Sequence, residues 1–592
     1  MTLKNLFTLS TAGLLLISNT IFANTTDLKK QVSNIREVRE PEAATGLMTK
    51  KAVYGDQFMV VAANPYASKA GFAVLAQGGS AVDAAIAVQL MLALVEPQSS
   101  GIGGGTFMLY WDNKNKKMTT FDGRETAPSA ASSELFLDAE GKPLKWIEAV
   151  VGGRSVGVPG LMATLKKAHD YYGKLPWADL FKQAIALAEK GFVVSPRLEK
   201  LLSMNFNPGI HRLPEINQYF FPNGKSVKAG DVLVNKKLAN VYRSIAKEGV
   251  DVFYKGWIAE KIVEKVQHAA ISPGLLSMND MANYQVIERA PVCGNYREYN
   301  VCGMAPPSSG GIAVIQILGQ LARFDLGKYP PNNVEAMHLF TQSSRLAFAD
   351  RDRYVADADF VQVPVSGLIN TDYLASRSAL INADKDMGRA VSGTPEGALA
   401  LANDNAIERP STSHFSIIDA QGNAVSMTSS IENGFGSALM VEGFILNNQL
   451  TDFSLAPKKD GKWVANRVQA NKRPRSSMAP TMVFSKDNSL KLLVGSPGGS
   501  RIINYVAQTI IGVLDWQLDP QESINLPKIT NRNYVTTLER GTNAELLQLP
   551  LAAKGHNVQI RDLNSGIHAI EVTKTGFIGG ADPRREGVVL AK

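Results

Sequence analysis

The sequence changes character abruptly between residues 411 and 412, and this break constrains the fold more than any other feature. Helical periodicity and helix-ending glycines dominate before it, whereas alternating segments rich in β-branched residues follow it. The segments expected to be strands are 412–419, 424–430, 480–484 and 490–494. A chain with helices mainly in its first two thirds and strands in its last third is expected to be α+β.

The helix signals before the break are specific enough to give boundaries. Ser80 and Asp83 form a capping pattern at the start of an apolar helix over 81–95. Further helices are expected over 67–76, 177–190 and 334–347. Residues 391–410 are polar or small and contain Gly and Pro, so they are expected to form an exposed, flexible loop in which proteolytic cuts are tolerated.

Composition excludes several classes of protein. Apolar residues make up 45% and charged residues 20% of 592 residues, which is ordinary for a globular protein and excludes a disordered chain. The formal net charge of +8 is small for this length. No basic run is interleaved with aromatic residues, so no nucleic-acid partner is expected.

The first 23 residues have the pattern of a secretory signal peptide. Lys4 precedes a mostly apolar stretch over 6–17, and the small residue Ala23 marks the expected cleavage point. A membrane anchor is the alternative, but a span needs about 20 apolar residues. We expect export to the periplasm, or secretion from a host with one membrane, and no membrane span after removal of residues 1–23.

The chain has two cysteines, Cys293 and Cys302, in two short β-like runs that could form a hairpin. In an oxidising compartment they are expected to form a disulfide, and two free thiols are the alternative. The seven histidines are scattered without metal-ligand spacing, so no metal site is expected.

Two short motifs are weak when taken alone. Residues 101–105 (GIGGG) lack the flanking residues of a phosphate-binding loop, which favours a tight turn where the backbone passes close to another group. Residues 153–157 (GRSVG) match the serine-hydrolase pattern, but Pro159 and Gly160 follow where that pattern requires a helix. We therefore disfavour both functional interpretations.

Ten motifs, taken together in their order and spacing, are much more specific. They are 96–98 (EPQ), 101–105 (GIGGG), 123–128 (GRETAP), 307–311 (PSSGG), 348–351 (FADR), 412–416 (TSHFS), 446–454 (LNNQLTDFS), 471–478 (NKRPRSSM), 495–501 (GSPGGSR) and 581–584 (ADPR). From about residue 52 to the C-terminus the chain resembles the γ-glutamyltranspeptidases, or glutathione hydrolases, of the N-terminal nucleophile hydrolases.

The resemblance implies a four-layer αββα sandwich and a precursor that cuts itself between Ser411 and Thr412. The products would be a large piece, 24–411, and a small piece, 412–592, that stay together as a heterodimer. We expect the strands after 412 to form the inner sheets and the helices before 411 to form much of the outer layers. Thr412 would supply both the nucleophile and, through its freed amine, the base. Ser430 would support the nucleophile, and no metal or organic cofactor is implied.

The resemblance also implies a donor site for glutathione and other γ-glutamyl amides, with water or an amino acid or peptide as acceptor. The α-carboxylate would bind Arg124, Ser476 and Ser477. The α-ammonium would bind Gln449, Asp452 and Glu432. The backbone N–H groups of Gly498 and Gly499 would bind the oxyanion.

Two departures from the family pattern bear on these assignments. Well-known members carry Asn where this chain has Glu432, and the segment 455–470 is short, with Trp463 as either a covering aromatic or a surface residue. One rival function is a related amidase of the cephalosporin or glutaryl acylase type. The other is a non-catalytic protein that binds γ-glutamyl compounds.

Overall fold

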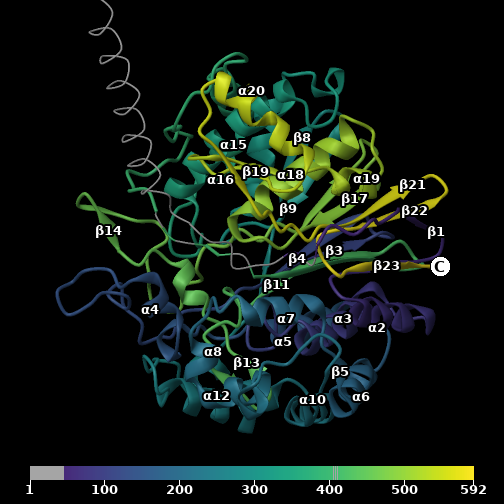
Figure 1. Cartoon of the computed structure of the whole chain (residues 1–592), viewed down its shortest axis with the longest axis vertical. Coiled ribbons are helices and arrows are strands. Elements are labelled where there is room, and N and C mark those ends of the chain that lie inside the picture. The colour runs from purple at the N-terminus through teal and green to yellow at the C-terminus, as the bar shows by residue number, and fades with distance from the viewer. Residues whose placement is uncertain (1–43, 45, 405, 407, 410) are drawn as a thin grey trace, which may run out of the picture. The chain divides into compact units, whose positions relative to one another are not determined.

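The computed structural model describes residue 44 and residues 46–404, 406, 408–409 and 411–592. Two seven-stranded antiparallel sheets lie at its centre (Figure 1). The first sheet has the order β23 (Val588–Ala591), β2 (Met59–Ala62), β10 (Ser413–Ile418), β11 (Ala424–Ser430), β3 (Gly105–Asp112), β4 (Lys117–Gly123) and β7 (Ile287–Arg289). The second has the order β1 (Val53–Gly55), β22 (Gly576–Ala581), β21 (His568–Thr573), β17 (Leu490–Gly495), β16 (Thr481–Phe484), β9 (Tyr299–Gly303) and β8 (Val292–Tyr296).

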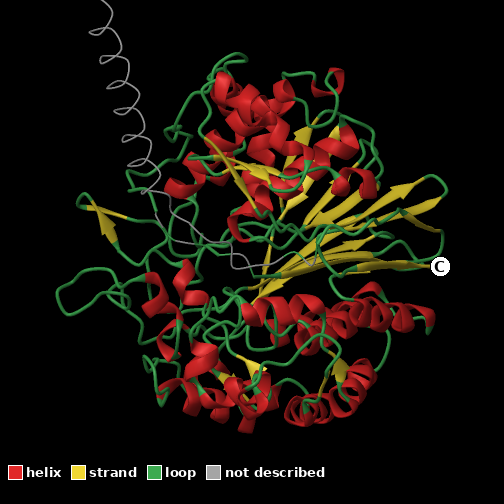
Figure 2. Ribbon diagram, in the orientation of Figure 1, coloured by secondary structure: helices red, strands yellow, loops and turns green. Residues whose placement is uncertain are grey.

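Alternation along the strands produces the layers. In β2, Val60 and Ala62 belong to the same core cluster as residues of α2 (Pro65–Ala76), α3 (Ala81–Val95) and α5 (Leu161–Tyr172), whereas Met59 and Val61 belong to the core shared with the second sheet. That sheet is covered in turn by α14 (Gly310–Leu321) and α18 (Ile502–Leu514), and α15 (Val334–Tyr354) packs against α14. Figure 2 shows the strands between two sets of helices. The expected αββα sandwich is confirmed.

The remaining elements pack on these layers or connect them. The other helices are α4 (Trp146–Val150), α6 (Lys182–Lys190), α7 (Pro196–Ser203), α8 (Gly209–Arg212), α9 (Pro214–Phe220), α10 (Lys236–Glu248), α11 (Asp251–Tyr254), α12 (Trp257–Gln267), α13 (Met278–Ala282), α16 (Val365–Leu368), α17 (Thr371–Ser378), α19 (Pro520–Asn525) and α20 (Gln548–Ala553). The short strands are β5 (Phe192–Val193), β6 (Val232–Leu233), β12 (Met440–Val441), β13 (Phe444–Ile445), β14 (Lys458–Lys459), β15 (Lys462–Trp463), β18 (Ile529–Asn531), β19 (Thr536–Glu539) and β20 (Val558–Arg561). No helix of the described residues has the length and apolar character needed to cross a membrane.

The helix predicted over 81–95, with its Ser80–Asp83 cap, is confirmed in α3. Ser80 Oγ accepts from the Asp83 backbone N–H at 3.1 Å, and Asp83 Oδ2 accepts from the Ser80 backbone N–H at 2.9 Å. All 15 residues of α3 are buried, which explains why it is apolar on every side. Trp177 to Lys190 instead splits into a 3₁₀ turn and α6, and α15 runs on to Tyr354.

The expectation that the inner sheets come from the strands after residue 412 was incomplete. Half of the fourteen strands come from before residue 411. Strand β2 lies between β23 and β10, and β3 lies beside β11. The sequence around the short apolar runs of β2 and β3 has no turn signal as clear as residues 420–423. The sequence pattern therefore did not predict these two strands. The two predicted pieces therefore share both sheets.

The loop expected over 391–410 is exposed only in its first part. Val391, Leu399 and most of their neighbours are exposed, but Asp404, Glu408 and Ser411 are buried. Carboxylates at 404 and 408 form ion pairs with buried arginines, and these pairs draw the chain into the protein. The expectation that the segment before Ser411 is exposed throughout was wrong. The signal peptide expected over 1–23 lies outside the described residues.

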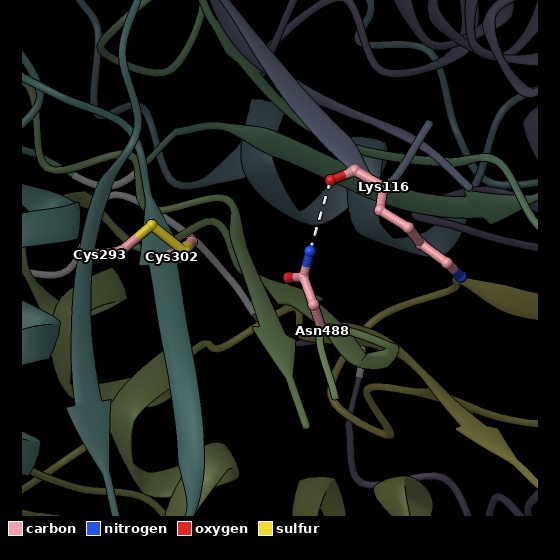
Figure 3. Close-up of a disulfide and its surroundings, with 4 residues drawn as sticks. All are labelled: Lys116, Cys293, Cys302 and Asn488. Atoms are coloured by element: carbon pink, nitrogen blue, oxygen red, sulfur yellow. Dashed lines mark hydrogen bonds between the residues drawn. A yellow bond between two sulfur atoms is a disulfide. The ribbon is translucent and has the colours of Figure 1, made fainter. Parts of the chain in front are cut away.

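Cys293 and Cys302 form a disulfide across neighbouring strands (Figure 3). They are directly paired residues of β8 and β9, at the edge of the second sheet. In the same view, the Asn488 side chain donates to the Lys116 carbonyl, which links the β16–β17 turn to the β3–β4 turn of the other sheet. The disulfide predicted from the sequence is confirmed.

Replacing both cysteines with serine is expected to lower the free energy of unfolding by at most about 2–3 kcal/mol, because the disulfide closes a short loop. The cysteines are nine positions apart in the sequence, and the ladder between β8 and β9 already holds them together. Denaturant unfolding of the wild type and the double variant measures the difference. A loss well above this range would show that the disulfide supports more than its own hairpin.

Candidate active site

Thr412 lies immediately before β10, in the interior of the sandwich, and is 3% exposed. The next residue, Ser413, is paired with Ser429 in the first sheet, and its hydroxyl donates to Glu96 Oε2 at 2.8 Å. Glu96 Oε1 in turn accepts from Arg197 Nη1 at 3.2 Å. The first residue of the strand is therefore fixed both by the sheet and by a buried ion pair, so the position of Thr412 is well defined.

The peptide bond between Ser411 and Thr412 is held by hydrogen bonds on its carbonyl side. Ser430 Oγ donates to the Ser411 carbonyl oxygen at 2.9 Å and accepts from the Glu432 backbone N–H at 2.8 Å. Ser411 Oγ donates to the Gln98 carbonyl at 2.7 Å. A donor on a carbonyl oxygen stabilises negative charge that develops there, so Ser430 is placed to assist attack on this bond.

The glycine-rich segment 101–105 supports the strand that carries Ser430. A Cβ atom on Gly104 would lie 2.2 Å from the Ser430 carbonyl oxygen, and one on Gly103 would lie 2.4 Å from the Ile445 carbonyl oxygen. Only glycine permits such an approach, which confirms the interpretation as a close turn. In the other weak motif, Ser155 Oγ donates to the Val150 carbonyl at 2.7 Å and is buried, as expected for a structural serine.

Arg124 follows the end of β4 and is almost fully buried. Its Nη2 atom donates to Asp452 Oδ2 at 2.5 Å and to the Arg475 carbonyl at 2.8 Å, and Nε donates to the Pro474 carbonyl at 3.1 Å. Gln449 Nε2 also donates to Asp452 Oδ2, at 2.8 Å. The structure therefore places Arg124, which is expected to bind the donor carboxylate, beside the residues expected to bind the donor ammonium group. Asp452 contacts both Arg124 and Gln449.

Three buried oxygens of the residues expected to bind the ammonium group lack an N–H or hydroxyl donor within the described part of the chain, although the Glu432 and Asp452 carboxyls lie close enough to share a proton. They are Glu432 Oε1, Gln449 Oε1 and Asp452 Oδ1. Glu432 has a φ of 77°, a conformation uncommon for a residue with a side chain. An unsatisfied buried acceptor costs about 1–3 kcal/mol, and an ammonium group offers three donors. This arrangement is suited to binding a primary ammonium group.

Burial controls the protonation of the same carboxyl groups. It raises the pKa of Asp452 to about 6, although Arg124 opposes the shift. Burial, followed by the nearby Asp452 carboxylate, raises the pKa of Glu432 well above its usual range. Burial also raises the pKa of Glu125, beside Arg124, to about 8. The group of carboxyls is therefore partly protonated near neutral pH in the absence of a cation.

The two predicted carboxylate-binding serines lie in a neighbouring cluster. Ser476 Oγ accepts from the Met478 backbone N–H at 3.2 Å, and its carbonyl accepts from the Ser309 backbone N–H at 2.7 Å. Ser477 Oγ accepts from Arg351 Nη2 at 2.6 Å and donates to the Glu408 carboxylate. Because the Arg475 carbonyl also accepts from Arg124, the two clusters are directly linked.

Gly498 and Gly499 form the turn between β17 and α18. Their φ angles are 137° and 57°, and a Cβ atom on Gly498 would lie 2.7 Å from the Tyr505 ring. Neither backbone N–H is used in a hydrogen bond among the described residues. The preceding strand, β17, ends at Gly495, which lies against the His414 ring. Two unused N–H groups in a glycine turn are suited to binding an oxyanion.

The comparisons with known proteins agree with this geometry. The family model described as gamma-glutamyltranspeptidase matches residues 67–592. The chain belongs to the γ-glutamyltranspeptidase family. Its sequence is 38% identical over 557 residues to the glutathione hydrolase proenzyme of Bacillus subtilis (strain 168), covering 91% of this chain and 92% of that protein. It is 37% identical over 542 residues to the glutathione hydrolase proenzyme of Escherichia coli (strain K12), covering 90% and 91%.

A solved structure is similar to the whole sandwich. Cephalosporin acylase from Bacillus halodurans matches with a TM-score of 0.82 and 26% identity, covering 94% of this chain and 99% of that one. Family membership makes this chain an enzyme of the hydrolase and transferase class. The described residues contain no cluster of three or more His, Cys, Asp or Glu side chains arranged to hold a metal ion.

Three residues of the site were missed from the sequence: Arg351, Arg475 and Glu408. Both arginines lie within quoted motifs, but no role was assigned to them. Glu408 lies in the segment expected to be exposed. Trp463 lies on the projecting β14–β15 hairpin, where Lys458 and Arg467 lie over its ring at 4.2 and 4.9 Å, and it is 44% exposed (Figure 1). In this structure it is a surface residue.

Proposed function

We propose that this chain is an autoprocessed γ-glutamyltranspeptidase and glutathione hydrolase. Residues 1–23 would be removed on export to the periplasm or the exterior, and cleavage between Ser411 and Thr412 would give the pieces 24–411 and 412–592. Family membership and the proenzyme names of its relatives support a processed heterodimer that acts on small molecules. The observation that carries the cleavage site is the hydrogen bond from Ser430 to the Ser411 carbonyl.

Self-cleavage would begin with attack of the Thr412 hydroxyl oxygen on the Ser411 carbonyl carbon. Ser430 stabilises the oxyanion, the carbon–nitrogen bond breaks, and the proton ends on the Thr412 nitrogen. Water then hydrolyses the resulting ester, which leaves a carboxylate on Ser411 and a free hydroxyl on Thr412. The new α-amino group has an ordinary pKa of about 8, so it can serve as the base for the next reaction.

In the mature enzyme the same hydroxyl would attack the γ-carbonyl of a γ-glutamyl amide. The donor ammonium would bind the three unsatisfied oxygens of Glu432, Gln449 and Asp452, and Gly498 and Gly499 would stabilise the oxyanion. Arg124, Ser476 and Ser477 would bind the donor carboxylate. The amine departs with a proton, and water or an amino acid or peptide acceptor resolves the γ-glutamyl-Thr412 ester. The three acceptors favour a donor with an amine over a glutaryl acylase substrate.

Denaturing electrophoresis of the purified protein tests this proposal. In proportion to the 63.9 kDa chain, the small piece is expected at about 20 kDa, and N-terminal sequencing should give Thr-Ser-His-Phe-Ser. A chromogenic γ-glutamyl anilide should then be hydrolysed. An intact chain without activity on this donor would support a non-catalytic binding protein instead.

The donor site also predicts a dependence on pH. Burial raises the pKa of Asp452 to about 6. In acid the Asp452 carboxylate is therefore protonated, and a donor with an ammonium group must displace that proton to bind. Below pH 6 we expect kcat/KM for a γ-glutamyl anilide to fall by up to about tenfold per pH unit more than protonation of the Thr412 amine alone would cause. A glutaryl anilide, which lacks the ammonium group, is the matched control. Equal falls for both donors would contradict the assignment of these carboxyls.

A further inference from the structure

The Glu408 carboxylate is bound as a ligand would be. Ser477 Oγ donates to one of its oxygens, and Arg351 Nη2 donates to the other. Arg475 Nη2 and Nε reach that second oxygen at 3.2 and 3.3 Å. Although burial opposes ionisation, the two guanidinium groups lower the pKa of Glu408 to about 2. A fully ionised carboxylate therefore fills a preformed anion site inside the protein.

The two arginines are also held by groups other than Glu408. Arg351 Nε donates to Ser309 Oγ at 2.9 Å, and Arg351 Nη1 donates to Asp352 Oδ1 at 2.9 Å. The Arg475 backbone N–H donates to Asn466 Oδ1 at 2.9 Å. Because other groups position Arg351 and the backbone of Arg475, these two residues do not depend on Glu408 alone for their place.

The charge of this site depends on the segment that ends at the cleavage point. Arg475 also pairs with Asp404 at 2.7 Å, and Asp404 and Glu408 both precede Ser411. If Asp404 and Glu408 move away after cleavage, Arg351 and Arg475 retain one carboxylate within 4 Å among the described residues. It belongs to Asp352, at 2.9 Å from Arg351 and 3.9 Å from Arg475. A buried excess of positive charge requires an anion. A substrate carboxylate would supply one.

We propose that Glu408 is an internal ligand of a carboxylate subsite formed by Ser477, Arg351 and Arg475, which holds the precursor for self-cleavage and excludes the donor until the Asp404 and Glu408 side chains leave the two arginines. This inference rests on the proposed function, because Ser477 is there assigned to the donor carboxylate. It adds Arg351 and Arg475 to that assignment. Glu408 is a positioning residue, since the carboxylate touches the subsite and not the reacting bond.

The first test follows self-cleavage of the precursor by electrophoresis over time. The variant Glu408→Gln should be cut at least tenfold more slowly than the wild type. Glu396→Gln is the matched control, because Glu396 is an exposed carboxylate on the same loop. Equal rates for Glu408→Gln, Glu396→Gln and the wild type would overturn the positioning role.

The second test measures L-glutamate binding to uncut protein by calorimetry. Thr412→Ala/Glu408→Gln should bind L-glutamate at least tenfold more tightly than Thr412→Ala, and Thr412→Ala/Glu396→Gln should not differ from Thr412→Ala. Thermal melting establishes that each variant is folded. Equal affinities would overturn the exclusion of the donor.

A third measurement needs no folded variant. A synthetic peptide of residues 402–411 should inhibit the mature wild-type enzyme competitively with the donor, and the same peptide with Gln for Glu408 should be at least tenfold weaker. Equal inhibition by the two peptides would overturn the internal-ligand proposal. Wild-type protein that stays uncut and inactive would instead overturn the proposed function, so the two failures are distinguishable.

Discussion

Replacing Thr412 with alanine is expected to leave a single uncut chain and to reduce γ-glutamyl transfer and hydrolysis to background. The substitution removes the hydroxyl that attacks the Ser411 carbonyl, and without cleavage the α-amino base never forms. One change therefore removes both nucleophile and base, and loss of a nucleophile typically costs about 10⁴–10⁶-fold in rate. Electrophoresis and a γ-glutamyl anilide assay measure the two effects separately.

The conservative variant Thr412→Ser is the control for this prediction. Serine keeps the hydroxyl, so this chain should still be cut and should retain measurable activity. Because Thr412 lies in a buried position ahead of β10, alanine is also a small enough change to preserve the fold. A Thr412→Ala chain that is cut at the same bond would assign the nucleophile elsewhere and would remove the basis of the mechanism.

Replacing Asp452 with asparagine is expected to lower kcat/KM for γ-glutamyl donors by about 10²–10³-fold. Asp452 pairs with Arg124 at 2.5 Å and presents an unsatisfied oxygen to the proposed ammonium site. An amide of the same shape leaves the Arg124 guanidinium and the donor ammonium group without the negative charge of Asp452. Breaking a buried ion pair costs about 3–5 kcal/mol. Steady-state kinetics with the γ-glutamyl anilide measures the loss.

Asp460→Asn is the matched control for this substitution. Asp460 is exposed in the β14–β15 hairpin, with a φ of 50° that asparagine also adopts readily. Its activity should equal that of the wild type. Self-cleavage of Asp452→Asn should be followed in parallel, so that a loss of donor binding is separated from a failure to mature. Unchanged kcat/KM in a fully processed Asp452→Asn enzyme would remove Asp452 from the donor site.

Local features were predictable from the sequence, and non-local features were not. The Ser80–Asp83 cap, the Cys293–Cys302 pair and the turn after β10 each depend on residues at most nine apart, and the structure confirms them. Strand β2 lies beside β10, which is more than 350 residues away along the chain. No local pattern encodes that neighbour, so the sharing of the sheets between the two pieces was missed.

The same distinction applies to the site. The resemblance placed Arg124, Gln449 and Asp452 in a common region, and the structure joins them by hydrogen bonds. Glu408 could not be predicted to be buried, because its partners lie 57 to 69 residues away and a polar, Gly- and Pro-containing segment normally indicates an exposed loop. Whether the assigned residues have the proposed roles remains a prediction for the experiments above.

The placement of β2 between β23 and β10 has a consequence for how a cut molecule would hold together. Removing the small piece would take strands out of the middle of both sheets, and removing the large piece would take β2 from the middle of the first sheet and strands from both edges of the second. Either loss exposes unpaired ladders. The pieces should therefore not dissociate on dilution in the way that two docked subunits do. Below the unfolding transition, the fraction of paired pieces should therefore not depend on protein concentration. Separately expressed pieces should aggregate rather than assemble.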